Sequence, residues 1–342
     1  MARLLMIVSS ARSINLASDK GHTTGYWADE VLKPYDKFVA AGVEVVVATP
    51  DGAPPHADPF GLEPRFHYPD EDKDFLSQVV RSFAPDMDDI LVTLHHFSEL
   101  DLIAARRVFY ALVDSGLDRD TAWSAVTRGA RTAWRDDRNF IDVLSTDSVV
   151  TSKLSPEHLR ALAYEVQDES ATRAKHMAER LASIEALQHP RDLSEISHEE
   201  LLSFDAVFFP GGHGPMVDLS SNADVARVLR LLHQRGKTVA AVCHGPAAFL
   251  SAGLGPEGAW LFDGYKLAGF TDEEEDQTPY GKLGLAWYLE SELKNRGAVF
   301  DDGDAAWVSH VVVDRNLVTG QNPGSSEATA EAILKKLGVE VK

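Results

Sequence analysis

The stretch KTVAAVCHGPAAFL, residues 237–250, contains the single cysteine of the chain, Cys243. The apolar run Val239–Val242 leads directly into Cys-His-Gly-Pro, and an alanine-rich stretch follows. This pattern predicts a nucleophile elbow, a sharp strand-to-helix turn that exposes one side chain at the carboxyl end of a parallel strand. A helix N-terminus there favours negative charge, so we expect the Cys243 pKa to lie below the ~8.5 of a free thiol. A buried, unreactive cysteine is the alternative that the sequence leaves open.

The composition is that of a globular protein of enzyme size. The chain has 342 residues, of which 44% are hydrophobic and 25% charged. Its 33 basic and 53 acidic residues give a formal charge of −20, which disfavours nucleic acid and membrane surfaces as partners. One cysteine allows no internal disulfide, and no segment approaches the ~20 apolar residues of a bilayer-spanning helix. The N-terminal apolar run is too short for a signal peptide, so we expect a cytoplasmic protein.

Short apolar runs, rich in β-branched or aromatic residues, predict buried strands of a parallel sheet. They are Leu4–Ser9, Val43–Ala48, Ala206–Pro210 and Val239–Val242. The amphipathic segment Tyr26–Ala41 lies between the first two and ends at Gly42, which gives the order strand, helix, strand. Near the C-terminus, His310–Val313 and Leu317–Val318 predict a hairpin, and Ser325 or Ser326 is placed to cap a closing helix. The expected fold class is a doubly wound, mostly parallel α/β sheet.

The middle of the chain departs from this pattern. Leu102, Ala105, Phe109 and Leu112 lie at helical spacing, and Ser155–Glu157 is a good helix start. We therefore expect an α/β core over residues 1–72 and 173–342. Residues 73–172 are expected to form a mainly helical insertion, which could serve as a lid or an interface.

Separate motifs in the chain together resemble one known superfamily. The chain is similar to the ThiJ/PfpI superfamily of class I glutamine-amidotransferase-like proteins, within the branch of heat-shock-type chaperones and glyoxalase III enzymes. The resemblance covers residues 1–70 and 190–342 and implies a flavodoxin-like fold and a homodimer. It rests on TTGYWADEVLKPY (23–35), VFFPGGHG (207–214), VAAVCHGPAAF (239–249), LAGFTDEEE (267–275) and VTGQNPGSS (318–326).

The resemblance implies a set of catalytic residues. Cys243 is the nucleophile, with His244 beside it, and the motif TG-x-x-x-x-E places Glu30 near the thiol. The third member of the triad lies three residues after the GFTD motif, at Glu275. Because acidic residues are consecutive here, Glu274 and Asp276 remain alternatives. A thiolate attacks aldehyde carbonyls, histidine transfers protons near neutral pH, and a carboxylate can orient that histidine.

The residues around this triad suggest how an oxyanion and a substrate are held. The backbone amides of Gly212 and His244 are expected to stabilise an oxyanion. His213 either faces the pocket or only completes the PGGHG turn, and Trp27 is a candidate for the pocket wall. Glu30, partly desolvated beside a developing negative charge, is expected to have a raised pKa.

We expect neither a metal nor a cofactor. His95 and His96 are adjacent, so their side chains point in different directions and do not favour a shared metal. The residues otherwise show no metal-ligand spacing.

The function expected from these features is that of a cofactor-independent, glyoxalase III-like lyase acting on methylglyoxal or another small reactive carbonyl. A specialised hydratase or lyase with a larger substrate is an alternative, because fold does not fix function. A stress chaperone is a second alternative, since it requires an exposed apolar patch rather than a thiol. A redox sensor is a third, because an accessible thiol of low pKa is readily oxidised. A peptidase and a glutamine amidotransferase are disfavoured, since the sequence shows neither an extended peptide groove nor a distant His-x-Glu pair.

Overall fold

A computed structural model describes residues 1–84, 100–253 and 259–340. Within them the chain divides into two compact units, residues 1–61 with 177–342 and residues 62–176. The first unit is α/β and the second is helical. Long helix α8 (Pro156–Ser183) begins in the second unit and ends in the first.

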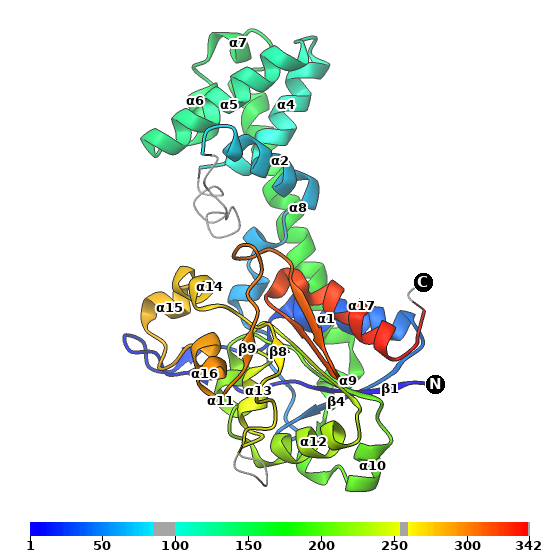
Figure 1. Cartoon of the computed structure of the whole chain (residues 1–342). Coiled ribbons are helices and arrows are strands. Elements are labelled where there is room, and N and C mark those ends of the chain that lie inside the picture. Colours follow the sequence, from blue (N-terminus) through cyan, green and yellow to red (C-terminus); the bar gives the residue numbers. More distant parts are fainter. Residues whose placement is uncertain (85–99, 254–258, 341–342) are drawn as a thin grey trace. The chain divides into compact units, whose positions relative to one another are not determined.

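The first unit is built on a seven-stranded sheet in the order β10-β11-β7-β6-β1-β4-β5 (Figure 1). All neighbours are parallel except β10 and β11, which form an antiparallel hairpin. The central strands are buried along their whole length because helices cover both faces of the sheet. The strands are β1 (Arg3–Ile7), β4 (Glu44–Thr49), β5 (Arg191–Asp192), β6 (Ala206–Phe209), β7 (Thr238–Val242), β10 (Val311–Asp314) and β11 (Leu317–Gly320).

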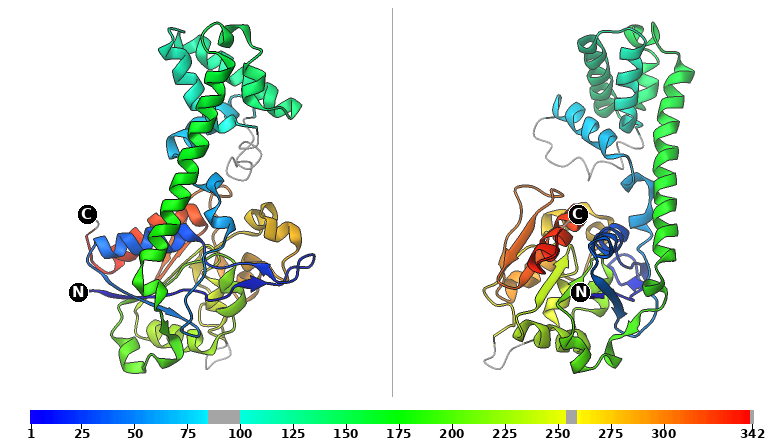
Figure 2. Two further views of the ribbon diagram at one scale, coloured as in Figure 1. Left: turned by 180° about the vertical axis from the view of Figure 1, so that it is seen from behind. Right: turned by 90° about the vertical axis from the view of Figure 1, so that its right-hand side faces the viewer.

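Helices α1 (Ala28–Ala40) and α17 (Ser326–Lys336) pack together on one face of this sheet, and α12 (Ala223–Gln234) covers the other (Figure 1 and Figure 2). This doubly wound arrangement confirms the predicted fold class. The shorter helices of the unit are α9 (Glu185–Gln188), α10 (His198–Leu202), α11 (Gly214–Asp218), α13 (Ala247–Leu250), α14 (Asp272–Gln277), α15 (Pro279–Leu283) and α16 (Leu289–Asn295). Two small additional sheets pair β2 (Ser13–Ile14) with β3 (His22–Thr23) and β8 (Lys266–Leu267) with β9 (Val299–Phe300).

The closing helix differs from the prediction in its cap. Ser325 is the N-cap residue of α17, but its side chain makes no capping hydrogen bond. Its hydroxyl instead donates to Asn322 Oδ1 at 3.1 Å and accepts from the His310 backbone N–H at 3.0 Å. The serine therefore ties the β11–α17 loop to the segment before β10.

The second unit has a hydrophobic core of its own, formed by its helices and centred on residues such as Val108, Phe109, Val126 and Phe140. Its helices are α2 (Asp70–Arg81), α4 (Ala105–Asp114), α5 (Arg119–Asp136), α6 (Phe140–Leu144), α7 (Ser148–Thr151) and the first part of α8. Short 3-10 helices of the chain lie at Phe60–Leu62, Pro64–Phe66, Leu102–Ala104, Leu193–Glu195 and Pro323–Ser325.

A buried ion pair accompanies this helical core. The Asp72 side chain is fully buried and accepts from Arg107 at 3.1 Å, and Arg107 also donates to Glu169 at 2.7 Å. Asp72 also accepts from Arg106 at 3.4 Å, so two arginines of α4 hold this buried carboxylate. The pair therefore helps to fix how α2, α4 and α8 pack within this unit.

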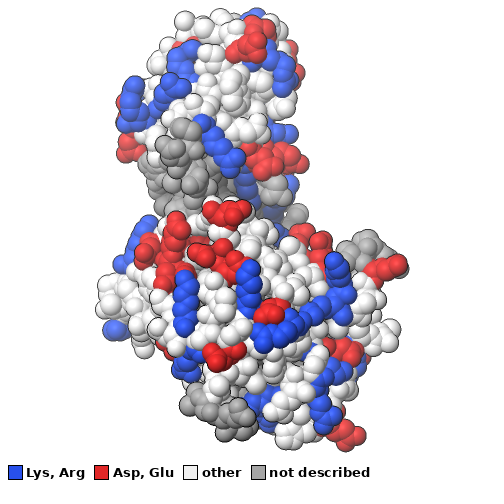
Figure 3. Space-filling model, in the orientation of Figure 1, with Lys and Arg blue, Asp and Glu red and all other residues white. Residues whose placement is uncertain are grey.

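The described surface carries charges of both signs. On the face that Figure 3 shows, lysine and arginine side chains are interspersed with aspartate and glutamate. In the described ranges, no helix is long and apolar enough to cross a bilayer.

Candidate active site

The elbow at Cys243 is formed by a residue with left-handed backbone geometry. Cys243 has φ 59° and follows β7 directly, while its backbone N–H still donates to Gly320 O of β11 at 3.0 Å. The turn closes when the Gly245 N–H donates to Val242 O at 2.8 Å. A Cβ at Gly245 would clash with the Phe209 carbonyl oxygen, so only glycine fits beside β6. A positive φ at a non-glycine residue is strained, and here that strain presents the thiol at the carboxyl end of the sheet.

Glu30 lies in the first turn of α1 and is completely buried beside the thiol. Its Oε2 accepts from the Gly211 backbone N–H at 2.7 Å, and the carboxyl group also hydrogen-bonds with Cys243. Its Oε1 has no nitrogen or oxygen partner among the described residues. Burial raises the pKa of Glu30 to about 8, although the hydrogen bonds to Cys243 and Gly211 oppose the rise. The carboxyl is therefore mostly protonated at neutral pH, as the sequence led us to expect.

The expected low pKa of Cys243 is wrong. Burial raises the pKa of the thiol well above its usual value, and the charge of the Glu30 carboxylate and its hydrogen bond raise it further. The Gly212 backbone N–H acts in the opposite direction but does not compensate. The helix after the elbow, α13, is only four residues long, so few aligned peptide dipoles favour a thiolate. The resting site thus holds a neutral thiol beside a neutral carboxyl group.

His244 and Glu275 complete a chain of hydrogen bonds from the thiol. Cys243 Sγ lies 3.3 Å from His244 Nδ1, and His244 Nε2 lies 2.7 Å from Glu275 Oε2. Because an ionised carboxylate only accepts, the Nε2 atom carries the proton and donates it. Nδ1 of the neutral imidazole is then an acceptor and faces the thiol. This tautomer is the one required of a base that removes the Cys243 proton.

The pKa values of His244 and Glu275 are shifted in the directions that this series of hydrogen bonds requires. Burial, together with repulsion from the nearby His213, lowers the pKa of His244 to about 4, although Glu275 acts in the opposite direction. Burial opposes ionisation of Glu275, but its charge interactions and hydrogen bonds with the two histidines outweigh that cost and lower its pKa. At neutral pH the site therefore pairs a neutral imidazole with a carboxylate.

The structure decides among the three acidic candidates of α14. Glu275 contacts His244, whereas Glu274 Oε1 accepts from the Trp307 N–H at 2.6 Å and from Asn322 Nδ2 at 2.8 Å. Glu274 also forms a capping box with Thr271 at the start of the helix. Asp276 accepts from the Tyr288 hydroxyl at 2.7 Å. Consecutive helical residues point in different directions, so these carboxyl groups reach different partners.

The PGGHG turn brings backbone donors to the sulfur. Gly212 has φ 85°, and its N–H hydrogen-bonds to Cys243. A Cβ at Gly212 would lie 2.5 Å from the backbone N of Trp27 and 2.6 Å from Gly25 O, so the turn packs directly on the loop before α1. The Gly212 N–H therefore lies beside the sulfur. The second expected donor, the His244 N–H, follows Cys243 in the elbow.

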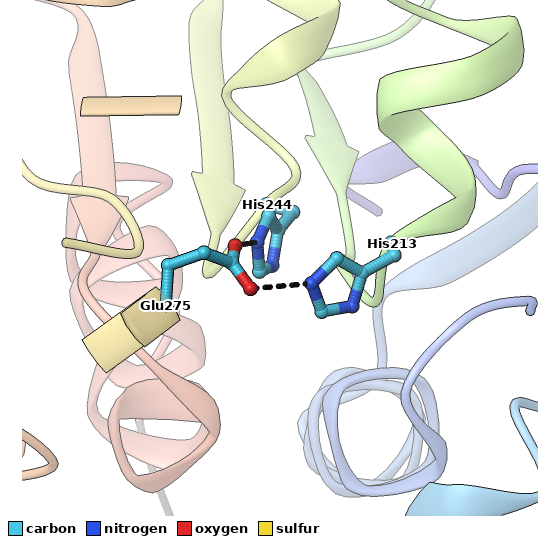
Figure 4. A group of neighbouring side chains, drawn as sticks. All are labelled: His213, His244 and Glu275. Carbon is cyan, nitrogen blue, oxygen red and sulfur yellow. Dashed lines mark hydrogen bonds and ion pairs between the residues drawn. The ribbon is translucent and has the colours of Figure 1, made fainter. Parts of the chain in front are cut away.

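His213 lies in the site rather than only completing the turn. Its Nε2 is 2.9 Å from Glu275 Oε1, so the two oxygens of Glu275 each contact one imidazole (Figure 4). Its ring stacks on Tyr280 at 3.7 Å between centroids, and the His244 ring lies 4.1 Å away. Trp27 is half-buried, donates its backbone N–H to Gly211 O at 3.1 Å and contacts Phe60 edge-on. Its position at the start of α1 is consistent with a pocket wall.

Sequence reasoning missed several buried polar residues that support the triad. Thr278 Oγ1 donates to Glu275 Oε1 at 2.8 Å. The Tyr280 hydroxyl donates to Asp58, which also accepts from Thr24. A single polar residue that belongs to no repeating pattern gives no sequence signal that it is buried. Only the TG-x-x-x-x-E motif, in which Thr24 is the first residue, pointed to this region.

One group of donor atoms in the described ranges has the composition of a metal site. His213, His244 and Glu275 offer nitrogen and oxygen atoms that all lie within 4.8 Å of one another. Both imidazoles turn Nε2 toward Glu275 at hydrogen-bond distance, so Nε2 would bind a metal only if its proton moved to Nδ1. The group therefore fits a hydrogen-bonded triad in this tautomer and a metal only in the other one. His95 and His96 lie outside the described residues.

Two family models match different parts of the chain. Residues 183–269 match the DJ-1/PfpI family, and residues 101–180, in the helical region, match the model described as adenylosuccinate lyase C-terminus.

Known relatives match the chain over less than half its length. Glyoxalase 3 of Candida albicans is 31% identical over 147 residues, which is 42% of this chain and 62% of the relative. The protein/nucleic acid deglycase HchA of Escherichia coli is 32% identical over 155 residues, which is 44% of this chain and 53% of the relative. The matched region thus spans less than two thirds of either relative.

Solved structures show the same fold. Glyoxalase III from Candida albicans superposes with a TM-score of 0.56 at 18% identity, with 100% of this chain and 98% of that chain covered. The Francisella tularensis Rapid Encystment Protein 24 KDa superposes with a TM-score of 0.57 at 18% identity, with 98% and 99% of the two chains covered. The segment that contains the Cys243 elbow thus matches the DJ-1/PfpI family model, and the chain shares its fold with these solved structures.

Proposed function

We propose that this protein is a cofactor-independent lyase of the glyoxalase III or deglycase type, which uses Cys243 to act on methylglyoxal or another small reactive carbonyl. The observation that carries the proposal is the arrangement of two buried carboxyl groups around one thiol. Glu30 hydrogen-bonds with Cys243 on one side, and His244 joins Cys243 to Glu275 on the other. The resemblance to Glyoxalase 3 of Candida albicans supports the reaction class.

The reaction begins with addition of sulfur to the aldehyde carbon. His244 Nδ1 takes the thiol proton as the S–C bond forms, and Glu275 stabilises the imidazolium. Glu30, which is protonated at neutral pH, gives its proton to the carbonyl oxygen. The product is a neutral hemithioacetal, with Glu30 now a carboxylate. The Gly212 N–H lies beside the sulfur and can donate to the developing oxyanion.

The two bases then move a proton between adjacent carbons. The Glu30 carboxylate removes the hydrogen from the former aldehyde carbon, and the His244 imidazolium protonates the neighbouring oxygen, which gives an enediol. Glu30 returns the proton to the second carbon while His244 takes the proton of the first hydroxyl, which leaves a thioester. Water then attacks the thioester, Glu30 takes a proton from it, and the departing sulfur regains its proton from His244. The sum is methylglyoxal plus water to lactate, with no external oxidant or reductant.

The decisive experiment compares the wild type with Cys243→Ala. Methylglyoxal is supplied, and lactate of each enantiomer is measured over time. We expect steady formation of D-lactate by the wild type and none above the uncatalysed rate in the variant. Equal lactate production by the two proteins would contradict the proposal, because no other thiol exists in the chain.

A specialised lyase or hydratase with a larger substrate is the second candidate. It is favoured by the helical unit, residues 62–176, and by the match of residues 101–180 to the adenylosuccinate lyase C-terminus. A panel of 2-oxoaldehydes of increasing size, together with aldehyde adducts of amino acids, separates the candidates. A kcat/KM that rises with substrate size in the wild type and is lost in Cys243→Ala would favour the specialised enzyme. A maximum at methylglyoxal would favour the first candidate.

A further inference from the structure

His213 is a buried histidine that the proposed chemistry does not use. It belongs to the PGGHG turn after β6, and only 6% of its surface is exposed. The residues around it come from three elements: Glu275 of α14, Tyr280 of α15 and His244 of the elbow. Tyr280 is in turn bonded to Asp58 in the loop before the helical unit. A histidine held on several sides in this way has little freedom to reach a substrate.

Its hydrogen bond decides how Glu275 is oriented. Glu275 Oε2 accepts from His244, and Oε1 accepts from both His213 and Thr278. With Oε1 fixed by two donors, rotation of the carboxylate is restricted and Oε2 stays on His244. His244 in turn must keep its Nε2 proton directed at Oε2 for its Nδ1 to face Cys243.

Two imidazoles that share one carboxylate cannot both be charged at low cost. The two rings lie 4.1 Å apart, and repulsion from His213 contributes to the low pKa of His244. When His244 takes the thiol proton, Glu275, which contacts both rings, stabilises the new cation. A charged His213 would compete with it for the same carboxylate.

We propose that His213 is a positioning residue that acts through Glu275 to hold His244 in the tautomer that accepts the proton of Cys243. This assignment rests on the proposed use of Cys243 and His244 as nucleophile and base. It makes His213, Glu275 and His244 one unit in which only His244 takes part in proton transfer with the thiol.

The test uses two substitutions of His213 that introduce the same amide group on side chains of different length. In His213→Gln the amide nitrogen occupies the place of Nε2 and can donate to Glu275. In His213→Asn the amide occupies the place of Nδ1 and is too short to do so. Both variants lose the ring that stacks on Tyr280, so a difference between them reports on the hydrogen bond alone. His233→Asn, at a histidine that contacts Tyr265 and Asn316 instead, is the control.

The readout is the rate at which iodoacetamide alkylates the chain's single cysteine, followed by mass spectrometry from pH 5 to pH 9 on the full-length protein. Loss of one hydrogen bond to a charged group corresponds to roughly a tenfold to hundredfold effect. We therefore expect alkylation of His213→Asn at neutral pH to fall by about that factor, with a changed pH dependence. His213→Gln should stay within about threefold of the wild type, and His233→Asn should be unchanged.

The proposal is overturned if His213→Asn alkylates with the rate and pH dependence of the wild type. It is also overturned if the Gln and Asn variants are equally impaired, because the ring rather than the hydrogen bond would then matter. Circular dichroism melting curves show whether each variant is folded. This experiment requires no substrate, so a failure to convert methylglyoxal would refute the proposed function and leave the test of His213 intact.

Discussion

The buried carboxyl groups on the two sides of Cys243 differ in their pKa values. On the α1 side, Glu30 accepts one backbone N–H and leaves Oε1 without a nitrogen or oxygen partner among the described residues, and its pKa rises to about 8. On the α14 side, Glu275 accepts from two imidazoles and a hydroxyl, and its pKa is lowered. Both groups are almost completely buried. Burial dominates at Glu30, whereas at Glu275 the charge interactions and hydrogen bonds with two histidines outweigh burial and keep the carboxyl ionised.

This difference suits the chemistry proposed for each side. A carboxyl that is protonated at neutral pH can give a proton to a carbonyl oxygen and then act as a base. A carboxylate that stays ionised can hold a histidine and stabilise its cation. In the proposed reaction, one thiol between them adds to a carbonyl while these side chains transfer the protons.

The largest loss of activity is expected when the ionised carboxyl group of Glu275 is replaced. Glu275→Gln removes the anion that stabilises imidazolium and brings an N–H₂ group to one of the histidines, so we expect kcat to fall by about a thousandfold. The matched variant is Glu274→Gln, one residue earlier in α14. Glu274 binds the Trp307 N–H and Asn322 and does not contact His244, so its loss should lower the melting temperature more than it lowers kcat. Equal losses of kcat in the two variants would mean that Glu275 has no special role.

Glu30→Gln should have the second largest effect. Gln keeps the shape and can still accept from the Gly211 N–H, but it cannot transfer a proton, so we expect a fall in kcat of at least about a hundredfold. The same substitution is expected to stabilise the folded protein at high pH, although it lowers kcat. A carboxyl with a raised folded-state pKa contributes stability that is full below its ordinary value of 4.5 and is lost as pH rises through about 8. The variant should therefore melt at a higher temperature than the wild type at pH 9, and the difference should shrink at pH 5.

A smaller and graded effect is expected from pH alone. The reaction needs neutral His244, whose pKa is about 4, and protonated Glu30, whose pKa is about 8. The kcat/KM for methylglyoxal should therefore rise with pH through about 4 and fall through about 8. In Glu30→Gln the alkaline decrease should disappear from the residual activity. An alkaline limb that persists in that variant would assign it to another group.

The sheet could be predicted from the sequence because its signals are local. The β-branched runs became β1, β4, β6 and β7, with ends within two residues of those expected. Arg191–Asp192 was not predicted as a strand, because two polar residues carry no apolar pattern and pair only at the sheet edge. The elbow was recognisable for a similar reason, since an apolar strand, a cysteine and small residues occur within a dozen positions.

The electrostatics of the site could not be read from the sequence. The Cys243 pKa depends on burial and on the Glu30 carboxyl, which is more than 200 positions away in the chain. The choice among Glu274, Glu275 and Asp276 depends on the direction in which α14 packs. His213 becomes a neighbour of Glu275 and Tyr280 only through folding. The homodimer, the cytoplasmic location and the lack of a cofactor stay predictions.

The charge states of the two carboxyl groups can be measured directly by infrared difference spectroscopy. The C=O stretching band of a protonated carboxyl is followed from pH 6 to pH 10 in the wild type, Glu30→Gln and Glu275→Gln. We expect a band at neutral pH that disappears as pH rises through about 8, is absent from Glu30→Gln and is still present in Glu275→Gln. A wild-type spectrum without a band that disappears near pH 8, or such a band that survives in Glu30→Gln, would contradict the claim that Glu30 is the acid of this site.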